Sequence, residues 1–131
     1  MKAADPCPCG SGKAYAACCG PAHGGLPAAT AEALMRSRYS AYVLGLEDYL
    51  LATWDPATRP EKLDLAGEPA PKWLGLEVKR HQPLDDDHAL VEFVARYRVG
   101  GRGQRLHETS RFRREGGRWY YIDGEFSAAS R

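Results

Sequence analysis

All four cysteines of this chain lie within thirteen residues near its start. They form two pairs, Cys7 with Cys9 and Cys18 with Cys19, separated by eight residues that include glycine, serine and lysine. This spacing brings two pairs of thiolates to one point, which is the arrangement that a tetrahedral metal ion requires. The feature therefore predicts a small metal-binding knuckle, which is too short to hold a core of its own.

The residues between the two pairs favour a tight turn, and lysines close in sequence supply positive charge. Gly10 and Gly12 permit the partly left-handed backbone that directs amide groups at the sulfur atoms. Lys2 and Lys13 are close enough in sequence to offset the negative charge of a thiolate cluster. The Ala-rich stretch 13–19 predicts about two helical turns that carry the second pair at one helix end.

Disulfides and free structural thiols are the alternatives to a metal site. Disulfides require an oxidising compartment, but residues 1–6 contain no apolar stretch that could serve as a secretory signal, so we expect a cytoplasmic protein. The first pair has C-x-C spacing instead of the more usual C-x-x-C, and spacing alone leaves the alternatives open. His23 can replace one thiolate as a metal ligand, but four cysteines suffice, so we do not expect His23 to bind the metal.

The stretch from Cys7 to Gly20, C-P-C-G-S-G-K-A-Y-A-A-C-C-G, resembles the SEC-C motif, the metal-binding tail of the SecA translocation ATPase. Four later segments are similar to the bacterial YchJ family, namely 33–42, 48–54, 106–112 and 118–124. That family combines a SEC-C knuckle with a domain similar to nuclear transport factor 2 (NTF2). The resemblance implies metal binding by the four cysteines, with zinc first and iron second, and a cone-shaped main domain.

Length and composition suit one compact domain with a small appendage. The chain has 131 residues, a net charge of +1 and 27% charged residues, which argues against a dedicated polyanion binder. No run of about twenty apolar residues is present to insert into a membrane. We expect a knuckle over 1–22, a linker over 23–29 and an NTF2-like domain over 30–131.

The main domain changes from helical to strand periodicity along its length. Thr30 can cap a helix that ends at Gly45, residues 47–54 predict a second helix, and 57–72 predict a covering loop. From Leu74 onward, alternating apolar residues predict an antiparallel meander. Its turns are expected at 83–87, 100–103 and 116–117. The fold class is therefore α+β, with two to three helices packed on a curved antiparallel sheet of about four strands.

Glu108 is a carboxylate that strand periodicity turns toward the core, because Leu106 and Phe112 share its face. A buried carboxylate needs a partner, and Arg38, or otherwise Arg36, can supply an ion pair. The alternative is a pocket carboxylate that acts as acid, base or ligand anchor. The other residues expected around this pocket are Tyr39, Tyr42, Phe93, Tyr97 and Trp119.

Arginines crowd the predicted meander, and strand parity places Arg96, Arg98, Arg111 and Arg113 on its outer face. Such a face is either solvated and paired within the molecule, or a docking face for RNA, the ribosome or an acidic protein. Nothing in the sequence sets the oligomeric state.

Three functions follow from these features. The first is a non-catalytic metal-binding adaptor whose knuckle docks on a protein or ribosomal partner. The second is a small-molecule enzyme that uses Glu108 with His107 or Asp123. The third is an RNA-binding protein. We favour the adaptor, because a metal with four protein ligands offers no open position for a substrate.

Overall fold

The structure is a computed structural model that describes residues 4–63 and 71–126. It contains a short 3-10 helix, three α-helices and four strands. The helical elements are η1 (Tyr15–Ala17), α1 (Cys19–His23), α2 (Ala31–Leu44) and α3 (Glu47–Ala52). The strands are β1 (Lys72–Asp85), β2 (His88–Val99), β3 (Arg102–Glu115) and β4 (Arg118–Phe126).

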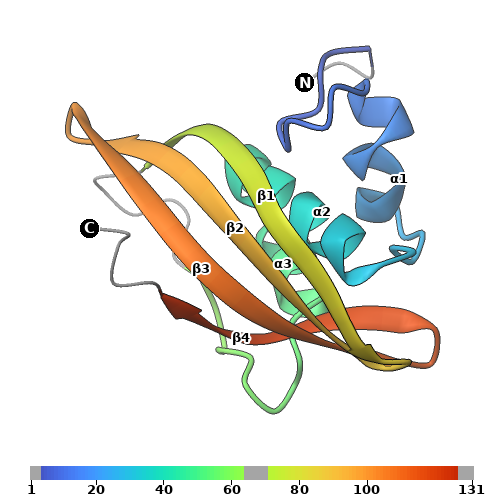
Figure 1. The fold of residues 1–131 in the computed structure, drawn as a ribbon. Helices are drawn as coiled ribbons and strands as arrows, with labels where there is room; N and C mark the ends of the chain where they lie inside the picture. The colour runs from blue at the N-terminus through green and yellow to red at the C-terminus, as the bar shows by residue number, and fades with distance from the viewer. Residues whose placement is uncertain (1–3, 64–70, 127–131) are drawn as a thin grey trace.

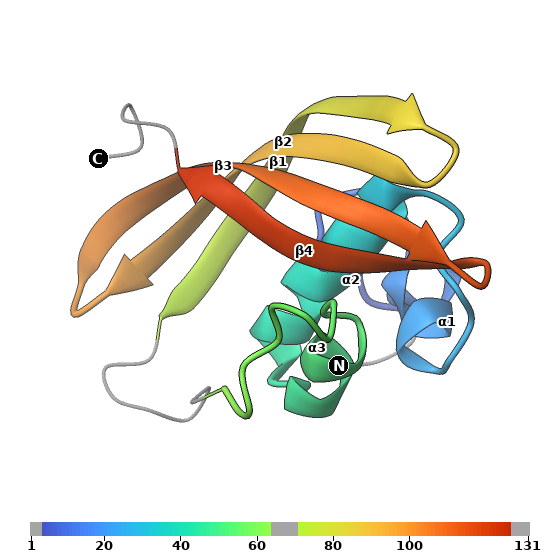
Figure 2. The same ribbon diagram turned by 90° about the horizontal axis from the view of Figure 1, so that it is seen from below.

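The four strands form one antiparallel sheet in the order β1–β2–β3–β4, which confirms the predicted meander. Register shifts interrupt the β1–β2 pairing at three places and the β3–β4 pairing at one. Such irregularities bend strands and increase their twist. The sheet curves over α2 and α3, which lie on one of its faces (Figure 1), and the view from below shows the same layering (Figure 2). The predicted α+β class is confirmed.

Two of the three hairpins turn on glycine pairs. Gly100 and Gly101 have φ angles of 58° and 80°, and Gly116 and Gly117 have 59° and 79°. Positive φ at both central residues gives the turn whose twist matches that of the flanking strands. The first hairpin turn is shorter than expected, because β1 continues as far as Asp85.

Helix α2 begins and ends where the sequence predicts. The Thr30 side chain accepts a hydrogen bond from the Ala33 amide at 3.0 Å, so it caps the first turn. Gly45 has a left-handed φ of 74° and stops the helix.

Helix α3 ends at Ala52, two residues before the predicted end at Trp54. The chain then pairs with β4, because the Tyr121 amide donates to the Thr53 carbonyl at 2.9 Å and the Asp55 amide donates to the Tyr121 carbonyl at 2.7 Å. These sheet-like hydrogen bonds take the place of a further helical turn.

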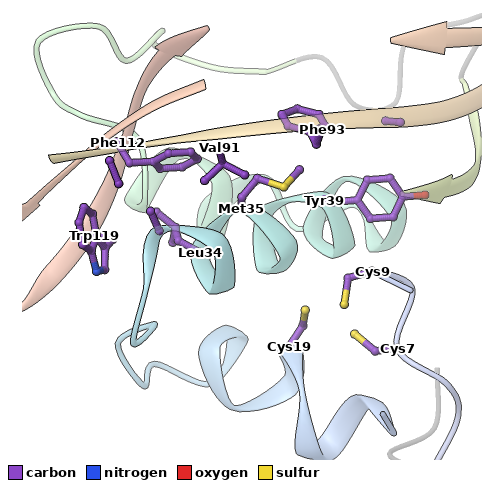
Figure 3. Packing of buried hydrophobic residues seen from close by; sticks show 13 residues of the cluster. Cys7, Cys9, Cys19, Leu34, Met35, Tyr39, Val91, Phe93, Phe112 and Trp119 are labelled. Carbon is purple, nitrogen blue, oxygen red and sulfur yellow. The ribbon is translucent and has the colours of Figure 1, made fainter. Parts of the chain in front are cut away.

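Helix α2 is buried on two sides. On one side, Leu34 and Met35 point toward Val91 and Phe93 of the sheet, and on the other side the cysteine sulfur atoms gather (Figure 3). Cys7, Cys9 and Cys19 belong to the same hydrophobic cluster as these core residues. The knuckle and the sheet domain therefore share one packed core through α2. No helix in the described ranges is long and apolar enough to cross a membrane.

Candidate functional site

The four cysteine sulfur atoms converge on one point. All four Sγ atoms lie within 4.8 Å of one another, and those of Cys9 and Cys18 are 3.5 Å apart. Zinc–sulfur bonds of about 2.3 Å in a tetrahedron place the sulfur atoms about 3.8 Å apart. No disulfide joins the four thiols, all of which lie in the described part of the chain. The cluster therefore fits a tetrahedral metal ion of this size.

The turn between the pairs directs polar groups at sulfur, as its glycines predict. Gly10 and Gly12 have φ angles of 77° and 86°. Between them, the Ser11 hydroxyl lies 3.0 Å from the Cys18 Sγ atom. Hydrogen bonds from Cys19 and Ser11, against the effect of burial, lower the pKa of Cys9 to about 4, which favours its thiolate, the form that binds metal. Lys13 is exposed beside the cluster, and Lys2 lies outside the described residues.

The predicted helix over 13–19 is wrong in its position. The chain forms η1 and then α1, which continues to His23. Cys18 lies between them with φ −131° and ψ −101°, outside helical values. A continuous helix would separate neighbouring side chains by about 100° around its axis. The break at Cys18 instead allows Cys18 and Cys19 to turn toward the same point.

Helix α2 packs along one side of the cluster (Figure 3). The fully buried Ser40 hydroxyl donates to the Cys19 Sγ atom at 3.4 Å and lies 3.6 Å from the Cys7 Sγ atom. Arg36 donates from Nη1 to the Cys9 carbonyl at 3.0 Å. Arg36, expected in the pocket, therefore belongs to the metal-site face of the helix. Sequence reasoning missed Ser40, although its i,i+4 spacing from Arg36 on a buried helix identifies this face.

His23 joins the knuckle to α2 and lies outside the sulfur cluster. Its Nε2 atom lies 2.8 Å from the Ser37 carbonyl and its Nδ1 atom 2.5 Å from the Tyr15 hydroxyl. Because a carbonyl oxygen only accepts, Nε2 carries the proton and donates. The ring also packs edge-on against Tyr49. The structure thus gives His23 a bridging role.

A second site is a cavity of about 380 Å³ between α2 and the sheet. Five of the expected pocket residues line it: Arg38, Tyr39, Tyr42, Phe93 and Glu108. Arg36, Tyr97 and Trp119 do not. Tyr97 packs behind Trp73, and Trp119 pairs with Arg114 toward the hairpin end of β4. Sequence reasoning missed Trp54 and Trp73 in this lining, and Phe112 and Tyr121 complete its aromatic part.

Glu108 faces the core as its strand parity predicts, and its residue is 7% exposed. Its Oε2 atom accepts hydrogen bonds from the Ser110 hydroxyl at 2.6 Å and the Tyr121 hydroxyl at 3.3 Å. Burial raises the pKa of Glu108 above its usual value in spite of these donors. Gly124 on β4 makes room for the group, because a Cβ there would overlap the carboxylate.

The predicted ion pair between Glu108 and Arg38 is wrong. No contact within 4.0 Å joins their charged atoms, both residues being in the described ranges. Arg38 instead donates from Nη1 to the Leu50 carbonyl and to the Thr53 hydroxyl, both at 2.7 Å. These acceptors lie at the end of α3, where helix carbonyls lack partners within the helix. The donors to Glu108 are the hydroxyl groups of Ser110 and Tyr121.

The partners proposed for a catalytic Glu108 lie elsewhere. His107 pairs with Glu92 at 2.7 Å, and Asp123 accepts two hydrogen bonds of 2.6 Å from Arg111. Neither His107 nor Asp123 lines the cavity. Strand alternation turns both side chains to the outer face of the sheet.

The outer-face arginines are paired within the molecule at several points. Besides Arg111, Arg113 contacts Asp55 at 2.6 Å, and Arg96 lies 3.8 Å from Glu77. Arg113 is half-buried because it reaches this partner, whereas Arg96, Arg98 and Arg111 are exposed.

Two family models match the chain. The SEC-C motif matches residues 4–21, and the model described as the YchJ middle NTF2-like domain matches residues 30–124. Among curated relatives, a UPF0225 protein of Chromobacterium violaceum is 62% identical and covers 90% of each chain. A UPF0225 protein of Ralstonia nicotianae is 58% identical over 92% of this chain and 91% of its own.

Two solved structures share the fold. The solution structure of a SEC-C motif containing protein from Rhodopseudomonas palustris has a TM-score of 0.81 at 43% identity, and covers 92% of this chain and 98% of its own. The crystal structure of a SEC-C motif containing protein from Psychrobacter arcticus has a TM-score of 0.78 at 35% identity, with 95% and 84% covered. The chain therefore belongs to the YchJ family, in which a SEC-C motif precedes an NTF2-like domain.

Proposed function

We propose that this protein is a zinc-binding adaptor whose metal fastens the knuckle to α2 so that the knuckle can dock on a protein partner. The observation that supports the metal role is the convergence of four sulfur atoms at a point backed by Ser40. Four cysteine ligands suit tetrahedral zinc, with iron second, and leave no open position for a substrate. When bound, the metal supplies folding energy and a fixed shape.

The docking surface in this proposal is the groove between the knuckle and the start of α2. It has a volume of about 670 Å³ and carries Ala17 and Pro21 on the knuckle side. Leu26 borders it and is 65% exposed, while Lys13 adds a positive charge at the edge. An exposed leucine beside small apolar residues suits an apolar side chain of a partner protein, with an acidic group opposite the lysine.

Point variants of the zinc-loaded full chain test the adaptor role. Removing the knuckle is unsuitable, because the cysteines share the core that Tyr39 and Met35 occupy. Leu26→Asp places a charge in the groove, and Leu84→Asp is the matched control, since Leu84 is 54% exposed on the β1–β2 hairpin. We expect cross-linked partners of the wild type to be lost with Leu26→Asp and kept with Leu84→Asp, at equal zinc content.

Two results would redirect the proposal. Capture that survives Leu26→Asp places the interface on the sheet domain, and capture abolished by ribonuclease identifies RNA or the ribosome as the target. If Lys13 contributes to docking, high salt should weaken the capture. A cytoplasmic location is part of the proposal, because free thiols and a thiolate metal site persist in a reducing compartment.

A further inference from the structure

The cavity under α2 contains polar groups that the fold positions but does not pair. The Nε1 atom of Trp54 is buried without a hydrogen-bond partner in the described part of the chain, and Trp54 lines the cavity. Arg38 lines the same cavity and is 5% exposed. Within the described residues, its hydrogen bonds all leave from Nη1, so the Nε and Nη2 edge of the guanidinium has no partner. A buried N–H donor without an acceptor, such as that of Trp54, is costly and points to a missing acceptor.

Arg38 is held in one orientation. Its guanidinium lies over the rings of Trp54 and Tyr121, with Cζ 4.9 Å and 4.6 Å from the ring centroids. The bonds to the Leu50 carbonyl and the Thr53 hydroxyl fix the Nη1 side. The opposite edge is the planar fork that binds a carboxylate through two parallel hydrogen bonds. A guanidinium fixed before binding loses little further entropy when a ligand arrives.

Glu108 does not fill this role. Its Oε2 atom is occupied by Ser110 and Tyr121, and no contact within 4.0 Å joins its carboxylate to Arg38 in the described ranges. Burial raises the pKa of Glu108, which favours the neutral carboxyl group and reduces repulsion of a second carboxylate. The positive charge of Arg38 is therefore the dominant charge of the cavity.

The remaining walls are apolar and aromatic. Tyr39 and Trp73 meet edge to face at a centroid distance of 5.6 Å, and Phe93 and Leu106 line the sheet side. Aromatic rings prefer such edge-to-face and offset contacts with one another. The volume of about 380 Å³ is in the range of sites that enclose small molecules.

We propose that this cavity binds a small aromatic carboxylic acid, whose carboxylate lies on Arg38 and the Trp54 Nε1 atom and whose ring packs against Tyr39, Trp73 and Phe93. This site is separate from the metal knuckle, and it does not depend on the adaptor function. The ligand class follows from the unpaired donors at one end and the aromatic walls at the other.

Three probes of one skeleton test the charge preference. Phenylacetate, phenylacetamide and phenethylamine carry a negative, a neutral and a positive head group on the same ring. Titrations of the metal-loaded full chain, followed by amide NMR shifts of residues on α2 and β3, give the three affinities. We expect phenylacetate to bind at least about tenfold more tightly than the other two, because only its head group makes charge-assisted hydrogen bonds.

Variants locate the binding to this cavity. Trp54→Phe removes the unpaired N–H donor and should weaken phenylacetate about tenfold. Trp119→Phe is the matched control, because Trp119 Nε1 is also buried and unpaired but its side chain does not line the cavity, so the affinity should stay unchanged. Ala95→Leu fills part of the cavity and should abolish binding.

Three results would overturn the proposal. The first is preferential binding of phenethylamine, which would make Glu108 the recognition group. The second is equal weakening by Trp54→Phe and Trp119→Phe in variants that still show native NMR spectra. The third is the absence of any shift with phenylacetate up to about 10 mM, an affinity at the weak end for a specific ligand.

Discussion

Arg38 and Glu108 line one cavity, and their hydrogen bonds go to different neighbours. Arg38 binds the end of α3, while Glu108 accepts from Ser110 and Tyr121. The hydrogen bonds from the two hydroxyl groups favour the ionised carboxylate, but burial outweighs them and raises the pKa of Glu108. At the scale of the residue, Glu108 is therefore a pH-sensitive group of the core.

Glu108→Gln should alter the pH dependence of stability. With a pKa raised in the folded state, Glu108 contributes stability that is fully present below its unfolded pKa and is lost as pH rises through the folded pKa. The glutamine side chain does not ionise. As the pH rises from 4 to 8, the free energy of unfolding of the variant should therefore increase relative to that of the wild type. The shift is about 1.4 kcal/mol for each unit of raised pKa. Urea unfolding across this range measures it, and parallel curves for both proteins would contradict it.

The Asp55–Arg113 pair contributes a pH dependence of stability that is opposite in sign to that of Glu108. Arg113 and the Ala57 amide hold the pKa of Asp55 below its usual value, so its stabilisation is present at neutral pH and lost as pH falls through the folded pKa. Asp55→Asn should lower the free energy of unfolding by about 1–3 kcal/mol at pH 7 and by less at pH 3. Asp123→Asn, in the exposed pair with Arg111, should cost less than about 1 kcal/mol. Equal costs in urea unfolding would show that burial of the Asp55 pair adds nothing.

At the scale of the element, α2 serves two sites from opposite faces. Met35, Arg38 and Tyr42 line the cavity, while Arg36 and Ser40 face the knuckle. Residues three and four apart share a helix face, so one 14-residue helix can present both sets of side chains. Its position relative to the knuckle depends on the hydrogen bonds of the second set.

Ser40→Ala should weaken metal binding about 10- to 100-fold, which is the usual effect of removing a group that supports the ligands. Ser37→Ala is the matched control, because the Ser37 hydroxyl bonds the Leu34 carbonyl and the Tyr49 hydroxyl and touches no sulfur. Competition with a chromophoric zinc chelator gives both affinities. If both variants lose affinity equally, the effect comes from helix packing and not from the Ser40–sulfur contact.

At the scale of the whole molecule, the knuckle and the sheet domain form one unit. Cys7, Cys9 and Cys19 are buried in the cluster that contains Leu34 and Phe93. Loss of the knuckle would expose part of this shared core. Unfolding of the two parts is therefore expected to be coupled.

Metal removal should lower the thermal midpoint of the entire chain. Calorimetry of the zinc-loaded protein should show one transition, and chelation should lower its midpoint by about 5 °C or more, since each kcal/mol corresponds to a few degrees in a chain of this size. The variant Cys9→Ser should not respond to the chelator. A sheet domain that melts at an unchanged temperature after chelation would show that the knuckle folds independently.

Much of the fold and the clustering of the four cysteines follow from local patterns. The confinement of Cys7, Cys9, Cys18 and Cys19 to one stretch predicts their convergence, Thr30 and Gly45 predict the limits of α2, and alternation predicts the meander and the inward direction of Glu108. Each of these signals depends on residues a few positions apart, whose relative directions the helix or strand period sets.

The tertiary structure alone decided which partners these residues meet. Arg36 contacts Cys9 from 27 positions away, Arg38 binds the end of α3, and the Tyr121 ring packs against Trp54. Several acceptors and rings in the sequence suit each of these side chains equally well in chemical terms. The curvature of the sheet and the placement of α2 select among them, because they determine which groups come within contact distance when the core closes.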